Sequence, residues 1–86
     1  MDKELIRRKI KSFVESGEET LSFDDVLIPV GIIEDIMKDM EFTFEMDGEE
    51  TNGWQVDFWY YFNHPAFGKY CYQGSLFYGE AKLRKD

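Results

Sequence analysis

The sequence offers few side chains of the types that catalyse reactions. His64 is the single histidine, and it precedes Pro65 in a segment that resembles a turn. A turn histidine is usually structural or exposed, and a catalytic one needs an acid or base within hydrogen-bonding reach. Asp57 is the candidate partner, but without an adjacent nucleophile and oxyanion donors it does not complete a hydrolytic site. We therefore predict a protein without enzymatic activity and keep a small enzyme using His64 and Asp57 as the weakest alternative.

The sequence gives equally little evidence for a metal site or a reactive cysteine. One histidine and one cysteine are too few for a structural zinc site, which takes four nitrogen or sulfur ligands. The segment DGEETNG, residues 47–53, has oxygen ligands but not the spacing of an EF-hand loop. Cys71 has no partner for an intramolecular disulfide and no basic neighbour, so we expect it to be a small, semi-buried apolar side chain. No metal and no cofactor is predicted.

The charge of the chain is strongly negative and unevenly distributed. The net charge is -8, and residues 15–53 carry thirteen acidic side chains against one base, Lys38. An acidic domain repels a phosphate backbone, so we predict no direct nucleic-acid binding. The acidic block is expected to be a solvated surface. The alternative function is a small acidic inhibitor or nucleic-acid mimic that docks on a basic protein, with Glu41, Glu45 and Asp47 repeating along a strand at about 6.7 Å.

Apolar residues that recur every three or four positions predict two helices in the first half of the chain. The first covers residues 2–16 and ends at Gly17. Ser22 with Asp25 resembles a capping box for a short helical turn at residues 23–28. A second helix is expected to start with proline 29 in its first turn and to run to about residue 40. The N-terminus has scattered charges and no apolar run, so neither a signal peptide nor a membrane span is predicted, and a cytoplasmic location is expected.

From Glu41 onward the apolar residues alternate, as they do in half-buried strands. The alternation predicts strands over residues 41–47, 54–62 and 70–78, and the last could continue towards Leu83. The predicted fold is α+β: one domain, residues 1–86, in which two N-terminal helices pack on one face of a three-stranded antiparallel β-meander (ααβββ).

The strand registers are expected to keep the apolar residues on one face. For the first two strands, an even register that pairs Phe44 with Val56 keeps the core together and leaves residues 47–53 as a loop. The two-residue turns suggested by the DG and NG dipeptides would instead give an odd register, which turns Phe44 to the other face. For the second and third strands, positions whose numbers sum to 132 should pair, so that Phe58 lies opposite Gly74.

The segment WQVDFWYYF, residues 54–62, carries the feature that suggests a function. Its even-numbered residues form a core face: Trp54, Val56, Phe58, Tyr60 and Phe62. Trp59 and Tyr61 remain on the opposite, polar face, and large exposed aromatic side chains are typical of interfaces. The registers surround them with the other predicted contact residues: Asp57, Gln73, Phe77, Glu41 and Glu45.

The preferred function is therefore a non-enzymatic protein-interaction module that self-associates through this aromatic face. The predicted partner is a second copy of the chain or another protein, for which a basic surface is one option. A structural alternative remains, in which the chain's own tail, residues 79–86, or the acidic loop covers Trp59 or Tyr61.

Overall fold

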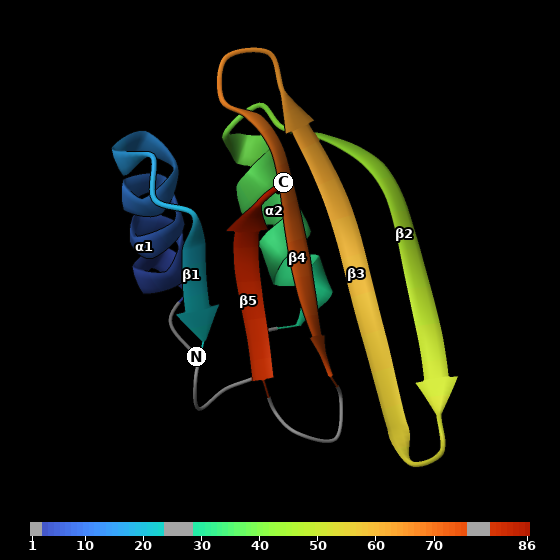
Figure 1. Ribbon diagram of the computed structural model, residues 1–86. Coiled ribbons are helices and arrows are strands. Elements are labelled where there is room, and N and C mark those ends of the chain that lie inside the picture. Colours follow the sequence, from blue (N-terminus) through green and yellow to red (C-terminus); the bar gives the residue numbers. More distant parts are fainter. Residues whose placement is uncertain (1–2, 24–28, 76–79) are drawn as a thin grey trace.

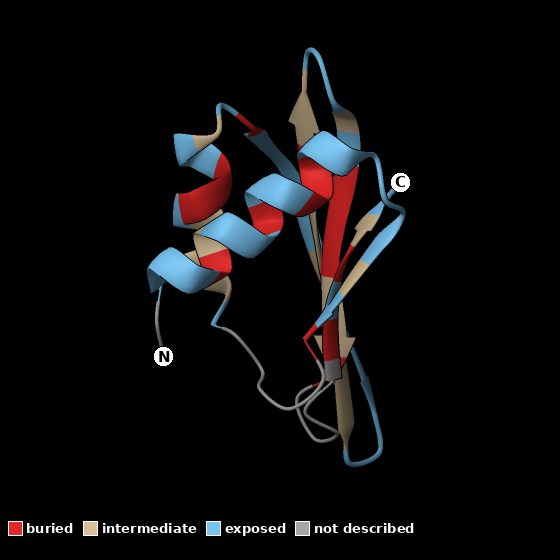
Figure 2. Cartoon of the chain, turned by 90° about the vertical axis from the view of Figure 1, so that its left-hand side faces the viewer, coloured by how far each residue is buried: buried red, intermediate tan, exposed pale blue. Residues whose placement is uncertain are grey.

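Five strands form one antiparallel sheet, and both helices lie on the same side of it (Figure 1, Figure 2). The computed structural model describes residues 3–23, 29–75 and 80–86, except for the side chain of Glu80. The elements in chain order are α1 (Lys3–Ser16), β1 (Thr20–Phe23), α2 (Val30–Asp39), β2 (Thr43–Asn52), β3 (Gln55–His64), β4 (Gly68–Ser75) and β5 (Glu80–Lys85). Across the sheet the strands are ordered β1-β5-β4-β3-β2.

The first helix agrees with the prediction. Gly17 follows it with a φ of 77°, in the left-handed region that glycine adopts without strain. The apolar stripe of α1 faces the core through its buried residues Ile6, Ile10, Phe13 and Val14.

The second helix starts at Val30, so Pro29 is its N-cap and does not lie in the first turn as predicted. Its C-terminus is closed by a Schellman motif. The backbone N–H of Glu41 donates to the carbonyl of Lys38, and that of Phe42 donates to the carbonyl of Met37, both at 2.9 Å. Glu41 has a φ of 70°, at the position where glycine is the usual residue. The prediction that Glu41 begins a strand is therefore wrong, because its backbone belongs to the helix end.

The predicted three-stranded meander with two preceding helices is also wrong, because the sheet has two further strands. β1 lies between the helices in the chain and pairs with β5, where Ser22 faces Lys82. Ser22 therefore does not cap a helix, while Asp25 and residues 24–28 lie outside the described residues. β5 turns back along β4 instead of continuing it towards Leu83. The pairing of β1 with β5 joins distant parts of the chain, which the periodicity of a single segment cannot reveal.

The predicted register of β3 and β4 is confirmed over the described residues. Tyr61 lies opposite Cys71, Asp57 opposite Ser75, and Phe58 opposite Gly74. An aromatic side chain over a strand glycine covers backbone that would otherwise be open to water. The pairs predicted for residues 76 and 78 lie outside the described part of the chain.

A tight turn, not the predicted seven-residue acidic loop, joins β2 and β3. Asn52 lies opposite Gln55, so Gly53 and Trp54 form the turn, and Gly53 has a φ of 67°. Glycine at the first turn position is the preference of a type II′ hairpin turn. Trp54, predicted to lie in the core, is instead 88% exposed at the tip of the hairpin.

The predicted register of β2 and β3 is wrong, and a β-bulge explains the error. Next to the turn the odd register holds, and Met46 lies opposite Tyr61. The register then shifts between Phe44 and Met46, which places Phe44 opposite Phe62 on the helix side. The extra residue is Glu45, and one extra residue turns the following side chains to the other face. The bulge thus reconciles a tight turn with a single core, a combination that an unbulged strand cannot provide.

The hydrophobic core lies between the sheet and the two helices, where Figure 2 shows the buried segments of the helices turned towards the strands. Aromatic rings fill much of it, and Phe13 of α1 packs edge-on against Tyr70 of β4 with ring centroids 5.6 Å apart. The buried core residues are Ile6, Ile10, Phe13, Val14, Phe23, Ile33, Ile36, Met37, Phe42, Phe58, Phe62, Tyr70, Tyr72, Ala81 and Leu83.

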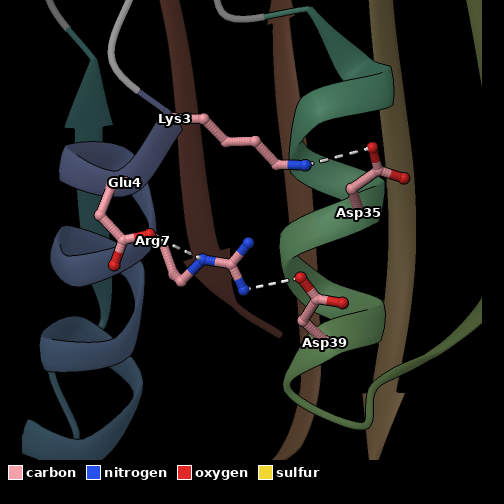
Figure 3. Close-up of polar contacts among 5 residues, drawn as sticks. All are labelled: Lys3, Glu4, Arg7, Asp35 and Asp39. Carbon is pink, nitrogen blue, oxygen red and sulfur yellow. Dashed lines mark hydrogen bonds and ion pairs between the residues drawn. The ribbon is translucent and has the colours of Figure 1, made fainter.

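The outer surfaces of the two helices are joined by ion pairs (Figure 3). Arg7 Nη1 lies 2.6 Å from a carboxylate oxygen of Asp39, and Lys3 Nζ lies 3.5 Å from one of Asp35. Glu4 approaches Arg7 Nε at 3.5 Å within α1. The basic residues of α1 thus neutralise part of the acidic charge of α2.

Candidate interaction surface

The sheet face opposite the helices bears no described helix (Figure 2), and alternate residues of every strand point to it. We call it the open face. By the strand registers and the ion pair of Glu45 with Lys69 it comprises Thr20 and Ser22 of β1, Thr43, Glu45, Met46, Gly48, Glu50 and Asn52 of β2, Gln55, Asp57, Trp59, Tyr61 and Asn63 of β3, Lys69, Cys71, Gln73 and Ser75 of β4, and Lys82 and Arg84 of β5.

Trp59 lies on the open face as predicted, but its ring is partly buried on the neighbouring strand. Gly48 is its cross-strand partner, and a Cβ atom at Gly48 would lie 2.3 Å from Trp59 Nε1 and 2.4 Å from Cε2. The indole therefore occupies the space above Gly48 that any other residue would fill. The ring is accommodated because position 48 has no side chain, which couples the two residues structurally.

Tyr61 stands beside Cys71, also as predicted, and belongs to a polar network that closes the middle of the open face. Arg84 Nε donates a hydrogen bond of 2.7 Å to Gln73 Oε1, and Arg84 Nη1 donates one of 2.9 Å to Asp86. Beneath them Cys71 is fully buried. Burial raises the pKa of the Cys71 thiol above its ordinary value, a shift that Arg84 and Tyr61 oppose. The raised pKa favours the protonated thiol, which is a poorer nucleophile than the thiolate.

Asp57 lines a shallow hollow in the open face. Gln55 Nε2 donates a hydrogen bond of 2.6 Å to Asp57 Oδ1, and Ser75 is the cross-strand neighbour of Asp57. Ser75 Oγ is buried and has no hydrogen-bond partner among the described residues, so it does not bond to Asp57. The hollow has a volume of about 820 Å³ and reaches Ser22 and Lys82 on the far side.

Four predicted contact residues, Asp57, Trp59, Tyr61 and Gln73, lie together on the open face. Glu41 does not flank Trp59, because it ends α2 and precedes β2. Glu45 does not flank Gln55 but occupies the bulge, where its carboxylate lies 3.7 Å from Lys69 Nζ. Phe77 lies outside the described residues.

The bulge also separates the carboxylates that were predicted to repeat along one side of a strand. Glu45 faces Lys69 on the open face, whereas Asp47 lies opposite Tyr60 on the helix side. Glu41 is not part of the strand at all. The regular acidic row that the mimic function requires is therefore not formed by these three residues.

Sequence reasoning missed several residues of the open face, among them Met46, Lys82 and Arg84. Met46 lies opposite Tyr61 and is 57% exposed. Lys82 and Arg84 of β5 pair with Gln73 and Cys71. The alternation of basic and apolar residues in AKLRK was a usable signal for β5, whereas no sequence signal reveals that Met46 follows a bulge.

His64 is structural. Its Nδ1 accepts hydrogen bonds from the backbone N–H groups of Ala66 and Phe67 at 2.9 and 3.1 Å, which ties the β3–β4 turn together. Its ring packs on Phe42 with centroids 4.9 Å apart. His64 and Asp57 stand near opposite ends of β3, and seven residues of strand separate them by roughly 23 Å.

Comparisons with protein-family models, with curated proteins and with solved structures gave no match to this chain. Neither described helix has the length and apolar composition needed to cross a lipid bilayer.

Proposed function

We propose that the chain is a non-enzymatic protein-interaction module that self-associates through the open face. The observation that carries the proposal is the placement of both helices on one side of the sheet (Figure 2). This placement leaves Trp59, Tyr61 and Met46 on a face without a described helix layer. Aromatic residues and methionine are enriched at the centres of protein interfaces. The structural role of His64 and its distance from Asp57 support the absence of catalysis.

Charge favours a second copy as the partner. Two copies repel each other overall, because each has a net charge of -8. On the open face, however, the described acidic and basic side chains nearly cancel. The acidic ones are Glu45, Glu50, Asp57 and Asp86, and the basic ones are Lys69, Lys82 and Arg84. Like charges across an interface cost affinity, so this near balance favours contact between two copies through the open face.

The size of the sheet sets the expected strength of the dimer. Five strands at about 4.8 Å spacing and some seven residues at about 3.3 Å cover roughly 550 Å² per copy. A stable interface of standard size buries about 800 Å² per partner. We therefore expect a weak dimer that forms at micromolar or higher concentration.

Sedimentation equilibrium with two matched variants tests the proposal. Met46→Glu places a charge beside Tyr61 on the open face, and Leu5→Glu makes the same change on α1, where Leu5 is 49% exposed against 57% for Met46. The wild type and Leu5→Glu should approach twice the chain mass of 10.2 kDa as the concentration rises, whereas Met46→Glu should stay at the single mass. A wild type that keeps the single mass at about 1 mM, where even weak interfaces associate, removes self-association.

A further inference from the structure

We infer that the free edge of β2 is a second binding site, which takes a basic, extended segment of a partner protein as an additional strand. β2 ends the strand order of the sheet, and no described strand pairs with its outer side (Figure 1). A free edge offers unpaired backbone donors and acceptors, and adding a strand to it is a common mode of peptide recognition. This site consists of backbone groups at the sheet edge and is distinct from the aromatic side chains of the open face, although Glu45 and Glu50 contribute charge to both.

The hairpin turn determines which backbone groups point outward. In a two-residue hairpin the pair that flanks the turn is hydrogen-bonded, and hydrogen-bonded and open pairs then alternate. Asn52 flanks the turn opposite Gln55, so Asn52, Glu50 and Gly48 direct their N–H and C=O groups to β3. The residues between and beyond them, Thr51, Glu49 and Asp47, direct theirs to the free edge. This regular outward segment lies beyond the bulge at Glu45 and can pair with an extended peptide.

The charge of the edge selects the partner. β2 carries four carboxylates, from Glu45, Asp47, Glu49 and Glu50, and no basic side chain. Only Glu45 has a described ion-pair partner, Lys69. Lysine or arginine side chains on an added strand would lie across from the other carboxylates, and opposite charges on neighbouring strands stabilise pairing.

The same charges disfavour a second copy at this edge. Two β2 strands side by side would place carboxylates against carboxylates, and like charges on adjacent strands are destabilising. Charged residues on edge strands commonly prevent such edge-to-edge association. The edge thus disfavours pairing with β2 of a second copy and is complementary in charge to a basic strand.

Titration with synthetic peptides, followed by amide NMR, tests the site on the full chain. The probe is a seven-residue, end-blocked peptide of alternating lysine and valine; the controls replace lysine by glutamate or valine by glycine. The lysine–valine peptide should bind, and the amide protons of Asp47, Glu49 and Thr51 should become protected from exchange. The glycine control keeps the charge but not the strand propensity, so it should bind at least about tenfold more weakly.

Two variants at one position separate backbone pairing from charge. Glu49→Pro removes an outward N–H without removing a bond to β3, because proline is tolerated on the free side of an edge strand. It should weaken the lysine–valine peptide at least about tenfold, whereas Glu49→Gln keeps the N–H and should weaken it about two- to fivefold. If Glu49→Pro does not fold, Thr51→Pro makes the same test at the next outward residue.

The outcomes distinguish this site from the open face. Met46→Glu should remove self-association and leave peptide binding intact. Equal binding of the glycine control, or unchanged binding to the folded proline variant, would show attraction by charge alone and overturn the inference. Loss of the dimer in Glu49→Pro would show that the edge pairs two copies and would overturn it as well.

Discussion

The two faces of the sheet exclude water in different ways. On the helix side, Tyr70 and Tyr72 of β4 are 1% and 0% exposed beneath the helices. Cys71, between them, points to the open face and is also 0% exposed, although no described helix lies over it. Its cover comes from side chains of the adjacent strands, with Tyr61 and Arg84 as its cross-strand neighbours.

This difference shows that a small sheet can bury part of its second face without a second layer. Long side chains lie along the strands, as Arg84 does when its guanidinium reaches Gln73, and their stems cover apolar surface while their polar ends stay wet. Each such cover consists of one side chain rather than a packed layer. We therefore expect the open face to depend on a few individual residues.

Gly48→Ala is the strongest test of that dependence, with the largest expected effect. The new Cβ would lie 2.3 Å from Trp59 Nε1, so the indole must move, and overpacking of this kind costs about 1–3 kcal/mol of unfolding free energy. Urea denaturation measures the loss. Gly31→Ala is the matched control: its Cβ meets no atom of the described residues within 4 Å, and the exposed helical position should gain about 0.5–1 kcal/mol.

A double variant shows whether Trp59 is the cause. In Trp59→Ala, the further change Gly48→Ala should cost little, so that the two effects are strongly non-additive. Additive losses would mean that the indole does not close this part of the open face, and the contrast between the two faces would fail there.

The correctly predicted parts of the fold are those that depend on residue spacing within a single segment or between neighbouring segments. The alternation in β3 and β4, together with Phe58 opposite Gly74, defined their register because a slip of one residue would turn a whole face. The apolar stripe of α1 followed from its spacing in the same way, and Pro29 located the start of α2 to within one residue.

The missed features depend on pairing between distant segments. The bulge at Glu45 has no characteristic residue. It is required only because the tight turn at Gly53 imposes an odd register on β2 and β3, and the sequence did not predict that turn. β1 is four residues long and is stabilised by β5 from the other end of the chain. The same holds for the candidate site. The alternation of side chains in β3 placed Trp59 on the correct face, but the burial of its ring over Gly48 depends on the register of β2.

Alkaline pH probes both faces at once and should have an intermediate effect. Burial raises the pKa of the Cys71 thiol above 9.0 and that of the Tyr70 hydroxyl above 10.0. The unfolded chain therefore loses these protons at lower pH than the folded chain. The stabilisation is fully present below about pH 9 and falls as pH rises, by at most about 1.4 kcal/mol per pH unit for each group.

Two variants show which face of the sheet causes the loss of unfolding free energy at alkaline pH. Cys71→Ala should flatten the stability curve where it begins to fall, from about pH 9, and Tyr70→Phe should flatten it from about pH 10. Urea unfolding at a series of pH values gives both curves. If Cys71→Ala had the same pH slope as the wild type, water would reach the thiol, and the open face would not be closed over Cys71.

The ion pairs between the helices should contribute least to the unfolding free energy. A small effect there would show that the helix side, unlike the open face, does not depend on individual exposed side chains. The side chains of Lys3 and Asp35 are 45% and 63% exposed and stand 3.5 Å apart, and exposed pairs of this kind contribute about 0.2–1 kcal/mol. Lys3→Gln should therefore lower the unfolding free energy by about 0.5 kcal/mol or less, and added salt should abolish the difference, because it screens exposed charges. The helix layer is held by its apolar stripe, in which Ile10 and Ile36 are fully buried. A loss well above 1 kcal/mol that persists in salt would mean that Lys3 holds the helix layer in place, as individual side chains do on the open face.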